Sequence, residues 1–460
     1  MSSATQRVLN QLGRFESPNV TYVDPAGDWP IVWKRARGCH VWDAEGRKYL
    51  DLTAAFGVAA AGHANPAVVQ AGQRQMGELL HAMGDVHPHA LKAQLLQALS
   101  DLTFGRWGSA TQPMQGQTLL GSSGFEAVEA ALKTARLATG KSGIIAFRGG
   151  YHGLGYGALN ATQRSHFREP FRNQLGEFGI FLDWPPCQGS CDDCDLPECQ
   201  ALEKLENDLR RIFRDHSVGA IIAEPIQARG GIRIPPPGFL PLLRRIATEQ
   251  GALLILDEIY TGFGRTGRWF ACEHTEVVPD LICLGKALTG GFPLSACVGR
   301  SEVMQAWPRS SGEAIHTSTF LGHPVGCAMA LVQIAEIRKK RLPERSARLG
   351  RQLLQELQAL PSRLGKLRLR ARGLGLMAGI ELSDNQGQPA TAESITLVKK
   401  LLANGFIVLP EGEHGEVISF TPPLTISETD LKRTIRTLQS LLEALGTAES
   451  RKPSTRRKQP

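Results

Sequence analysis

Apolar residues in the middle of the chain follow two patterns, short continuous runs and longer stretches with helical spacing. The runs Gly143–Phe147, Val218–Ala223 and Ala252–Leu256 predict strands that are buried on both faces. Helical spacing over Phe125–Ala138 and Leu240–Glu249 predicts helices between them. Strands that alternate with helices are typical of an α/β domain with a largely parallel sheet.

The pattern changes in the last third of the chain. Helical spacing extends from Cys327 to Arg341 and over Leu349–Leu360, and a final helix is predicted near Ser427–Leu445. The apolar segment GLGLMAGIEL lies between these helices. Together they predict a smaller C-terminal α+β domain. We divide the chain into residues 1–60, a segment that joins the small domain; 61–326, the large domain; 327–446, the small domain; and 447–460, a disordered basic tail.

Composition excludes several classes of protein. The 460 residues are 42% hydrophobic and 21% charged, which is typical of a globular chain. No apolar run reaches the roughly 18 residues that a membrane span needs. The N-terminus, MSSATQRVLNQLGRFESPNV, lacks the apolar stretch of a secretory signal, so we expect a cytoplasmic protein with no membrane partner.

The net charge of +8 is concentrated at one end of the chain. The last ten residues, RKPSTRRKQP, hold five basic and no acidic side chains, so the rest of the chain carries +3. A short segment rich in Pro and Arg is typical of a solvated terminus. Nucleic acid is therefore not an expected partner.

Chemistry-bearing side chains follow two of the predicted strands. Asp257 and Glu258 end the apolar run LLIL, and Lys286 follows the strand predicted over Asp280–Leu284. Ligands of open α/β sheets bind at the carboxyl ends of the strands. Singly, each residue is typical of a solvated surface, but a lysine among small and apolar residues has a lowered pKa, which favours Schiff-base formation.

The surrounding segments resemble the class III, pyridoxal-phosphate (PLP)-dependent aminotransferases. The resemblance spans about residues 30–445 and is carried by DEIYTGFGRTG, DLICLGKALTGGFPLSA, VWDAEGRKYLDL, GHANP, GSSGFEAVEAALKTAR, FRGGYHG, AEPIQ, HTSTFLGHP and PPLTIS. It implies fold type I, with a large, mostly parallel-sheet domain and a smaller C-terminal α+β domain. It also implies a transaminase that moves an amino group from an amino acid or primary amine to an oxo acid.

The resemblance also implies roles for individual residues. Lys286 would form the Schiff base with PLP and then move the proton of the substrate. Asp257 would keep the pyridine nitrogen protonated, because a nearby anion favours the charged form. Thr319 would reach the phosphate of the neighbouring subunit's cofactor, which implies a homodimer. The other implied cofactor contacts are Ser123, Gly124 and Phe125 at the phosphate, Tyr151 on the ring, and His152, Glu224, Ile259 and Tyr260.

The predicted substrate pocket departs from the family. Relatives that use 2-oxoglutarate carry a Glu two places after EPIQ and an Arg in a VIR segment, whereas this chain has Arg229 and Ser419 there. Arg229 is either a ligand of the substrate carboxylate or a solvated charge. Phe56 aligns with a position that gates the substrate channel and makes that wall apolar. Pyruvate or a substrate with a hydrophobic side chain is then as plausible as a dicarboxylate.

A Cys-rich segment at 182–200 reads as an insertion that is foreign to the family pattern. Cys187, Cys191, Cys194 and Cys199 lie within 13 residues. Four close thiols in a reducing compartment predict a structural metal site, with zinc favoured over an iron–sulfur cluster, or else reduced thiols without metal.

Two other functions remain open from the sequence. A PLP-dependent amino-acid racemase or epimerase on the same fold would use the same Lys286 and Asp257 but return the proton to the α-carbon. A sensor or scaffold that binds the cofactor without catalysis would have no chemical need of Lys286.

Overall fold

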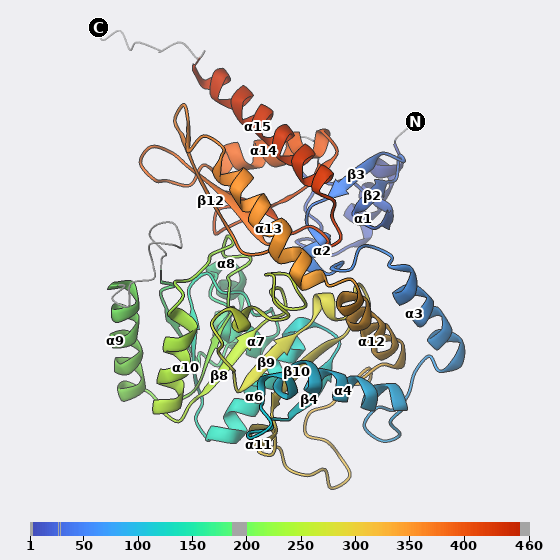
Figure 1. Cartoon of the computed structure of the whole chain (residues 1–460), viewed down its shortest axis with the longest axis vertical. Coiled ribbons are helices and arrows are strands. Elements are labelled where there is room, and N and C mark those ends of the chain that lie inside the picture. The colour runs from blue at the N-terminus through green and yellow to red at the C-terminus, as the bar shows by residue number, and fades with distance from the viewer. Residues whose placement is uncertain (1–2, 26, 28, 186–199, 451–460) are drawn as a thin grey trace.

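The computed structural model of the chain describes residues 3–25, 27, 29–185 and 200–450. A mixed seven-stranded sheet forms the centre of the lower part of the molecule in Figure 1. Six of its strands run in one direction, and β10 runs antiparallel to both of its neighbours. In spatial order the strands are β4 (Gly116–Gly121), β10 (Ser295–Arg300), β9 (Leu281–Leu284), β8 (Leu253–Asp257), β7 (Val218–Ala223), β5 (Gly143–Phe147) and β6 (Gly179–Leu182).

Both faces of this sheet are buried, as the continuous apolar runs predict. On β8, Leu254 and Leu256 belong to one apolar core, and Ile255 between them belongs to the core on the opposite face. Helix α10 (Phe239–Glu249) contributes Leu243 to the first core. Helix α6 (Gly124–Thr139) contributes Val128 to the second. Successive strand residues point to opposite faces, so each strand anchors two helical layers.

The remaining helices of this part flank the sheet or extend its layers (Figure 1). Helix α9 packs on α10, and α12 packs on both α3 and α4. Their bounds are α3 (Pro66–Glu78), α4 (Ala90–Leu102), α5 (Phe104–Trp107), α7 (Tyr156–Ala161), α8 (Ser165–Arg168), η1 (Glu169–Gln174), α9 (Gln200–Asp215), η3 (Ala271–His274), η4 (Lys286–Leu288), α11 (Ser301–Met304) and α12 (Pro324–Lys339).

Two smaller sheets lie in the upper part of Figure 1, with helices α13 (Leu342–Gln358), α14 (Thr391–Ala403) and α15 (Glu428–Ser450). The antiparallel one consists of β11 (Arg363–Leu364), β12 (Leu367–Gly373), β13 (Ala378–Ser383), β16 (Val417–Phe420) and β15 (Leu409–Glu411). The other consists of β1 (Trp33–Arg37), β2 (His40–Asp43), β3 (Lys48–Asp51) and β14 (Phe406–Ile407). Strand β14 pairs in parallel with β3, so residues near both ends of the chain share one sheet. Helices α1 (Ala4–Phe15) and α2 (Ala54–Gly57) complete the N-terminal part.

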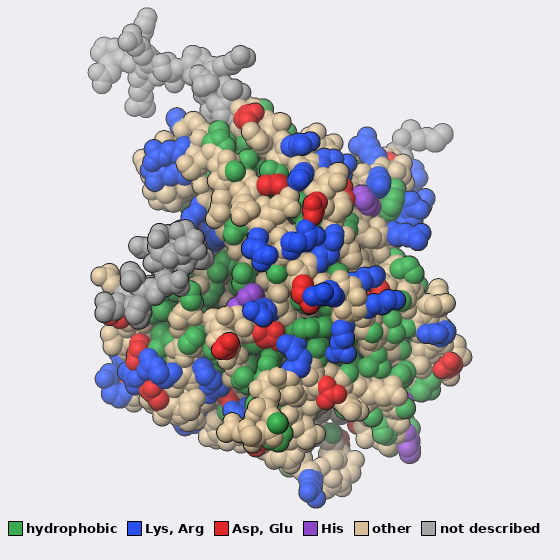
Figure 2. Space-filling view, viewed as in Figure 1, with side chains coloured by type: hydrophobic (Ala, Val, Ile, Leu, Met, Phe, Trp, Pro, Cys, Tyr) green, Lys and Arg blue, Asp and Glu red, His purple; other side chains and the backbone are tan. Residues whose placement is uncertain are grey.

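Charged side chains of both signs occur on the face drawn in Figure 2, where acidic residues are interspersed among the Lys and Arg. Within the described residues, every helix is too short or too polar to cross a bilayer.

Candidate active site

Five strands end at the same edge of the large sheet, and the residues that follow them converge there. Ser123 follows β4, His152 follows β5, Glu224 follows β7, Asp257 ends β8, and Lys286 follows β9. They belong to or adjoin a cavity of about 350 Å³, within the usual range for small-molecule sites. Its lining residues are Gly124, Phe125, Tyr151, His152, Gly153, Leu154, Glu224, Ala228, Arg229, Asp257, Ile259, Tyr260 and Lys286.

Lys286 presents its amine to this cavity. Its Nζ lies 4.1 Å from the centroid of the Tyr260 ring, and its backbone has a φ of 42°, which is strained for a side-chain-bearing residue. Burial lowers the pKa of Lys286 to about 8, although the charges of Asp257 and Glu224 act in the opposite direction. A large share of this amine is therefore neutral and nucleophilic near pH 8.

Asp257 is a buried carboxylate that two groups hold in place. His152 Nδ1 lies 2.8 Å from Asp257 Oδ2, and the Ile259 amide donates to Oδ1 at 3.1 Å. With a carboxylate as the acceptor, Nδ1 of His152 carries the proton. One side of Asp257 is thus fixed by the imidazole, and the residue remains on the cavity wall.

Glu224 is the second buried acid of the cavity. It accepts hydrogen bonds from the amides of Tyr151 (3.0 Å) and Ala228 (3.1 Å). Burial, together with the charge of Asp257, raises the pKa of Glu224 to about 7 against the opposing effect of His152. Glu224 therefore fixes the loop that presents Tyr151 to the cavity.

The loop between β4 and α6 ends in a helix N-terminus that faces the cavity. The amides of Ser122 and Ser123 both donate to Glu126, the latter at 3.0 Å. The Ser123 hydroxyl is buried and has no hydrogen-bond partner among the described residues. Gly124 lines the cavity, and a Cβ there would lie 3.1 Å from the Ile259 side chain. A free hydroxyl beside a helix N-terminus suits a phosphate group.

Of the three residues predicted to bind substrate, one lines the cavity and two do not. Arg229 lines the cavity, with its guanidinium 5.2 Å from the Tyr151 ring centroid. Phe56 is 46% exposed, and Ser419 donates its hydroxyl to the Leu409 carbonyl at 3.1 Å within the β15–β16 pair. Phe56 and Ser419 are not among the lining residues. Thr319, predicted to serve a neighbouring subunit, lies outside the cavity on an exposed turn.

Sequence reasoning missed two charged residues beside the cavity. Glu411 ends β15 and is 5% exposed. Arg164 donates to the backbone carbonyls of Arg229 and of Gly412 (2.7 Å). A glutamate within the otherwise apolar strand LPE was the available signal, but more than 100 residues separate it from Lys286. No local pattern joins positions that far apart.

The predicted metal ligands Cys187, Cys191, Cys194 and Cys199 lie outside the described residues. Elsewhere in the described part of the chain, no group of three or more His, Cys, Asp and Glu could hold a metal ion. The metal site at the Cys-rich segment therefore stays a prediction.

The cavity fits PLP on chemical grounds. A reactive amine at Lys286, a fixed carboxylate at Asp257 and an unpartnered hydroxyl at Ser123 correspond to the aldehyde, the pyridine nitrogen and the phosphate of that cofactor. A larger hollow of about 720 Å³ at the β4 edge has no lysine among its lining residues.

Comparisons with known proteins agree with this chemistry. The family model for class III aminotransferases matches residues 22–442. The acetylornithine aminotransferase of Methanopyrus kandleri is 35% identical, over 91% of this chain and 96% of its own. The putrescine aminotransferase of Pectobacterium atrosepticum is also 35% identical, over 97% of this chain and 90% of its own. The PLP-bound amine transaminase of an uncultivated Pseudomonas species is 29% identical, with a TM-score of 0.83 and coverage of 94% of this chain and 98% of its own.

These matches bear on the alternatives that the sequence left open. The matched relatives are named as transaminases of different donors, which favours transamination over racemisation and over binding without catalysis. The structural match covers the large sheet and the smaller sheets together, as fold type I requires.

Proposed function

This chain belongs to the class III aminotransferases, and from that premise we propose that it transfers an amino group from an amino acid or primary amine to an oxo acid by means of Lys286 and Asp257. PLP-dependent transamination is the activity of the family. The observation that carries the assignment to these residues is the buried amine of Lys286, whose pKa is lowered to about 8, in the same cavity as the His152–Asp257 pair. When bound, PLP supplies an aldehyde to the donor amine and withdraws electrons from its α-carbon.

Each residue has a defined task in this proposal. Lys286 would hold the cofactor through Nζ, and the same amine would move the proton of the donor carbon that bears the amino group. Asp257 would keep a proton on the pyridine nitrogen, and His152 keeps Asp257 oriented. Ser123 donates its hydroxyl to the phosphate together with the N-terminal amides of α6. Tyr151, Ile259 and Tyr260 line the cavity and would exclude water from the cofactor ring.

The active enzyme is proposed to be a homodimer. An exposed apolar patch consists of Leu80, Met83, Val86, Ile315 and Phe320. Its two segments lie together, since the His81 and Phe320 rings are 5.5 Å apart and Thr317 donates to Asp85 at 2.8 Å. Thr319 lies in the second segment, so pairing of this patch with a second copy would bring Thr319 close to the partner. The apolar exposure supports this assembly.

Turnover with a lysine variant tests the assignment. Holoenzyme is mixed with a panel of amines and amino acids and an oxo acid, and the new amino acid is detected by chromatography. We expect Lys286→Ala to lose turnover, while Lys34→Ala, a change at an exposed lysine, keeps it. Turnover that survives in Lys286→Ala would contradict the role of Lys286. Loss of optical activity from the donor without a new amino acid would instead indicate a racemase.

A further inference from the structure

The aromatic ring of Tyr260 lies against the amine of Lys286. Lys286 Nζ is placed over the face of the ring, 4.1 Å from its centroid. A cation within about 6 Å of a ring centroid is attracted by the negative face of the π-system. Tyr260 is 9% exposed and lines the same cavity as Lys286, so the contact is largely shielded from bulk water.

Packing fixes the Tyr260 ring in this place. Tyr260 belongs to a buried apolar cluster with Ile226, Ile232 and Met377. Gly57 also approaches the ring closely, because a Cβ at Gly57 would lie 3.0 Å from Tyr260 Cε1. The φ of Gly57 is 81°, so its backbone conformation also favours glycine. The ring therefore has little room to turn away from the amine.

The hydroxyl of Tyr260 is bound to the C-terminal part of the chain. Thr421 Oγ1 lies 3.0 Å from the Tyr260 hydroxyl oxygen and donates to the Thr53 carbonyl at 3.3 Å. Because the single proton of the Thr421 hydroxyl goes to Thr53, the Tyr260 hydroxyl is the donor in its bond with Thr421. Tyr260 therefore has no proton left to donate within the cavity, whereas its ring face is directed at Lys286.

The contact between the ring and the amine is not an ion pair. Burial raises the pKa of Tyr260 to about 12, so the phenol is neutral near pH 8, where Lys286 titrates. The charged groups that act on the Lys286 amine are Asp257, Glu224 and Glu411, which favour its protonated form, and Arg229, which opposes it. The ring adds an attraction for the ammonium without adding a charge to the cavity.

This kind of contact suits an amine that has to take up a proton and release it again. A carboxylate paired with the amine would bind the ammonium strongly and in a fixed direction. An aromatic face attracts the ammonium more weakly and without a directional hydrogen bond, and it packs against the neutral amine as well. Such a face keeps the amine in the cavity in both protonation states.

We propose that Tyr260 is a positioning residue for Lys286, whose ring face receives the ε-ammonium whenever the amine is not bonded to the cofactor, while its hydroxyl binds Thr421 and not the cofactor. This inference rests on the proposed function and deepens it, because Tyr260 acts on the reaction through Lys286. The ring is then required for the role, and the hydroxyl is not.

The pH dependence of PLP uptake tests this role without any turnover. The rate of PLP incorporation into the apoprotein is followed by stopped-flow absorbance across the neutral and alkaline range. Tyr260→Leu and Tyr260→Met keep an apolar side chain but remove the ring, so we expect the midpoint to move to lower pH by about one unit. Tyr260→Phe keeps the ring and is expected to keep the wild-type midpoint. Tyr22→Leu, at an exposed tyrosine, is the control.

The ringless variants decide the outcome of this experiment. If their midpoint stays at the wild-type value or moves to higher pH, the ring does not favour the ammonium and the proposal is overturned. Circular dichroism of each apoprotein checks that the variant is folded, and the two ringless variants serve as replicates of one another.

Steady-state kinetics of the holoenzyme provide a second readout. We expect Tyr260→Leu to lower kcat about tenfold with KM for the donor little changed, because the amine is no longer held in place for proton transfer. Tyr260→Phe should retain kcat close to that of the wild type. Equal losses of kcat in the two variants would show that the hydroxyl is required, which contradicts the proposal.

Binding of PLP separates this role from a direct contact of the hydroxyl with the cofactor. Tyr260→Phe is expected to bind PLP as tightly as the wild type does, because the proton of Tyr260 is donated to Thr421. Weaker PLP binding in Tyr260→Phe would place the hydroxyl on the cofactor and refute the inference. If the wild type turns over no donor, the proposed function fails, and the midpoint of PLP uptake still decides the role of Tyr260.

Discussion

At the scale of single residues, one cavity is lined by an amine with a lowered pKa and by a carboxylate that a histidine holds in place. Lys286 owes its lowered pKa first to burial, and Asp257 owes its orientation to His152. Both residues were predicted from the sequence, because each directly follows an apolar run that forms a strand. Glu411 was not predicted, since its place near Lys286 depends on the hydrogen bond between the Gly412 amide and the Arg229 carbonyl, which joins segments far apart in the chain.

The lowered pKa of Lys286 predicts the pH dependence of cofactor uptake. Only the neutral amine reacts with an aldehyde, so the rate of PLP incorporation into the apoprotein should rise with pH and level off above about 8. Stopped-flow absorbance of the bound cofactor measures it. A rate that continues to rise toward pH 10 would show an ordinary lysine.

The lowered pKa of Lys286 also makes the free energy of unfolding depend on pH. Between pH 8 and 10.5 the unfolded chain binds the Lys286 proton that the folded chain has released, so the free energy of unfolding rises with pH through that window. It falls again as pH is lowered from 10.5 to 8, and below about 8 this group causes no further change. The free energy of unfolding of the apoprotein, measured against pH for the wild type and for Lys286→Met, isolates the contribution of Lys286.

Asp257→Asn is expected to retain the fold and to lose roughly a hundredfold or more in kcat. The amide no longer favours a protonated pyridine nitrogen, and a preorganised charge at the reacting group is usually worth that much. Steady-state kinetics of the variant measure the loss in kcat, and circular dichroism serves as the control for folding. Unchanged kcat would remove Asp257 from the chemistry.

At the scale of elements, apolar periodicity predicted the large sheet well. The runs Gly143–Phe147 and Val218–Ala223 are β5 and β7 with the expected bounds, and the predicted helix at Leu240–Glu249 is α10 less one residue. Buried strands and amphipathic helices each have a local pattern of apolar residues, so the sequence alone predicts them. The parallel pairing of β14 with β3 is a contact between distant segments and has no such local signal.

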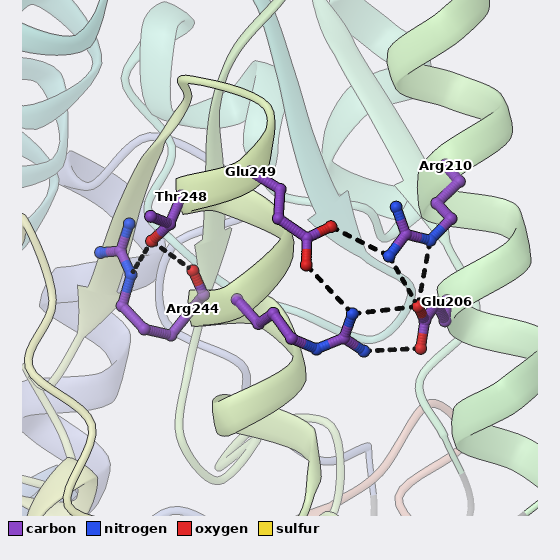
Figure 3. Close-up of polar contacts among 6 residues, drawn as sticks. Glu206, Arg210, Arg244, Thr248 and Glu249 are labelled. Carbon is purple, nitrogen blue, oxygen red and sulfur yellow. Dashed lines mark hydrogen bonds and ion pairs between the residues drawn. The ribbon is translucent and has the colours of Figure 1, made fainter.

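Surface charge also links two elements, as Figure 3 shows for Glu206 and Arg210 of α9 and Glu249 of α10. Arg210 pairs with Glu206 and with Glu249, each at 2.9 Å. Arg245 of α10 pairs with Glu206 at 2.6 Å and with Glu249 at 3.2 Å. These four side chains form one network between the outer helix and the layer beneath it.

The network should make a small contribution to thermal stability, and this contribution should decrease as the salt concentration rises. Glu206→Gln removes the acid that both arginines share, and we expect the Tm to fall by on the order of 1 °C at low ionic strength and by less at high salt. Glu203→Gln, an exposed acid on the same helix, serves as the control. Equal shifts for both variants at both salt concentrations would show that the network is not the cause.

At the scale of the whole molecule, the site lies between segments that are far apart in the chain. Arg265, after β8, donates to the carbonyls of Leu376 (2.9 Å) and Pro422 (2.6 Å), so a buried guanidinium joins the large sheet to the C-terminal part. The resemblance to a family indicated this arrangement, whereas hydrophobic patterning alone did not. The substrate wall was predicted least well, because side-chain direction at Ser419 is set by pairing within a distant sheet.

Assembly is a prediction at this scale. The chain has a mass of 50.0 kDa, and light scattering should give twice that value for the wild type. Met83→Glu places a charge in the exposed apolar patch and is expected to shift the mass toward that of one chain, with loss of turnover. Leu137→Glu, at an exposed position on α6, is the control. A monomeric wild type with full activity would contradict the proposed dimer.

The cavity at the carboxyl edge of the sheet is proposed to carry out transamination. The most direct measurement mixes PLP-loaded protein with one donor amine and no acceptor and follows the cofactor by absorbance and chromatography. We predict stoichiometric conversion of PLP to pyridoxamine phosphate in a single turnover, reversed when an oxo acid is added. Retention of all PLP while the donor loses its optical activity, or no change with any amine, would contradict transamination at this cavity.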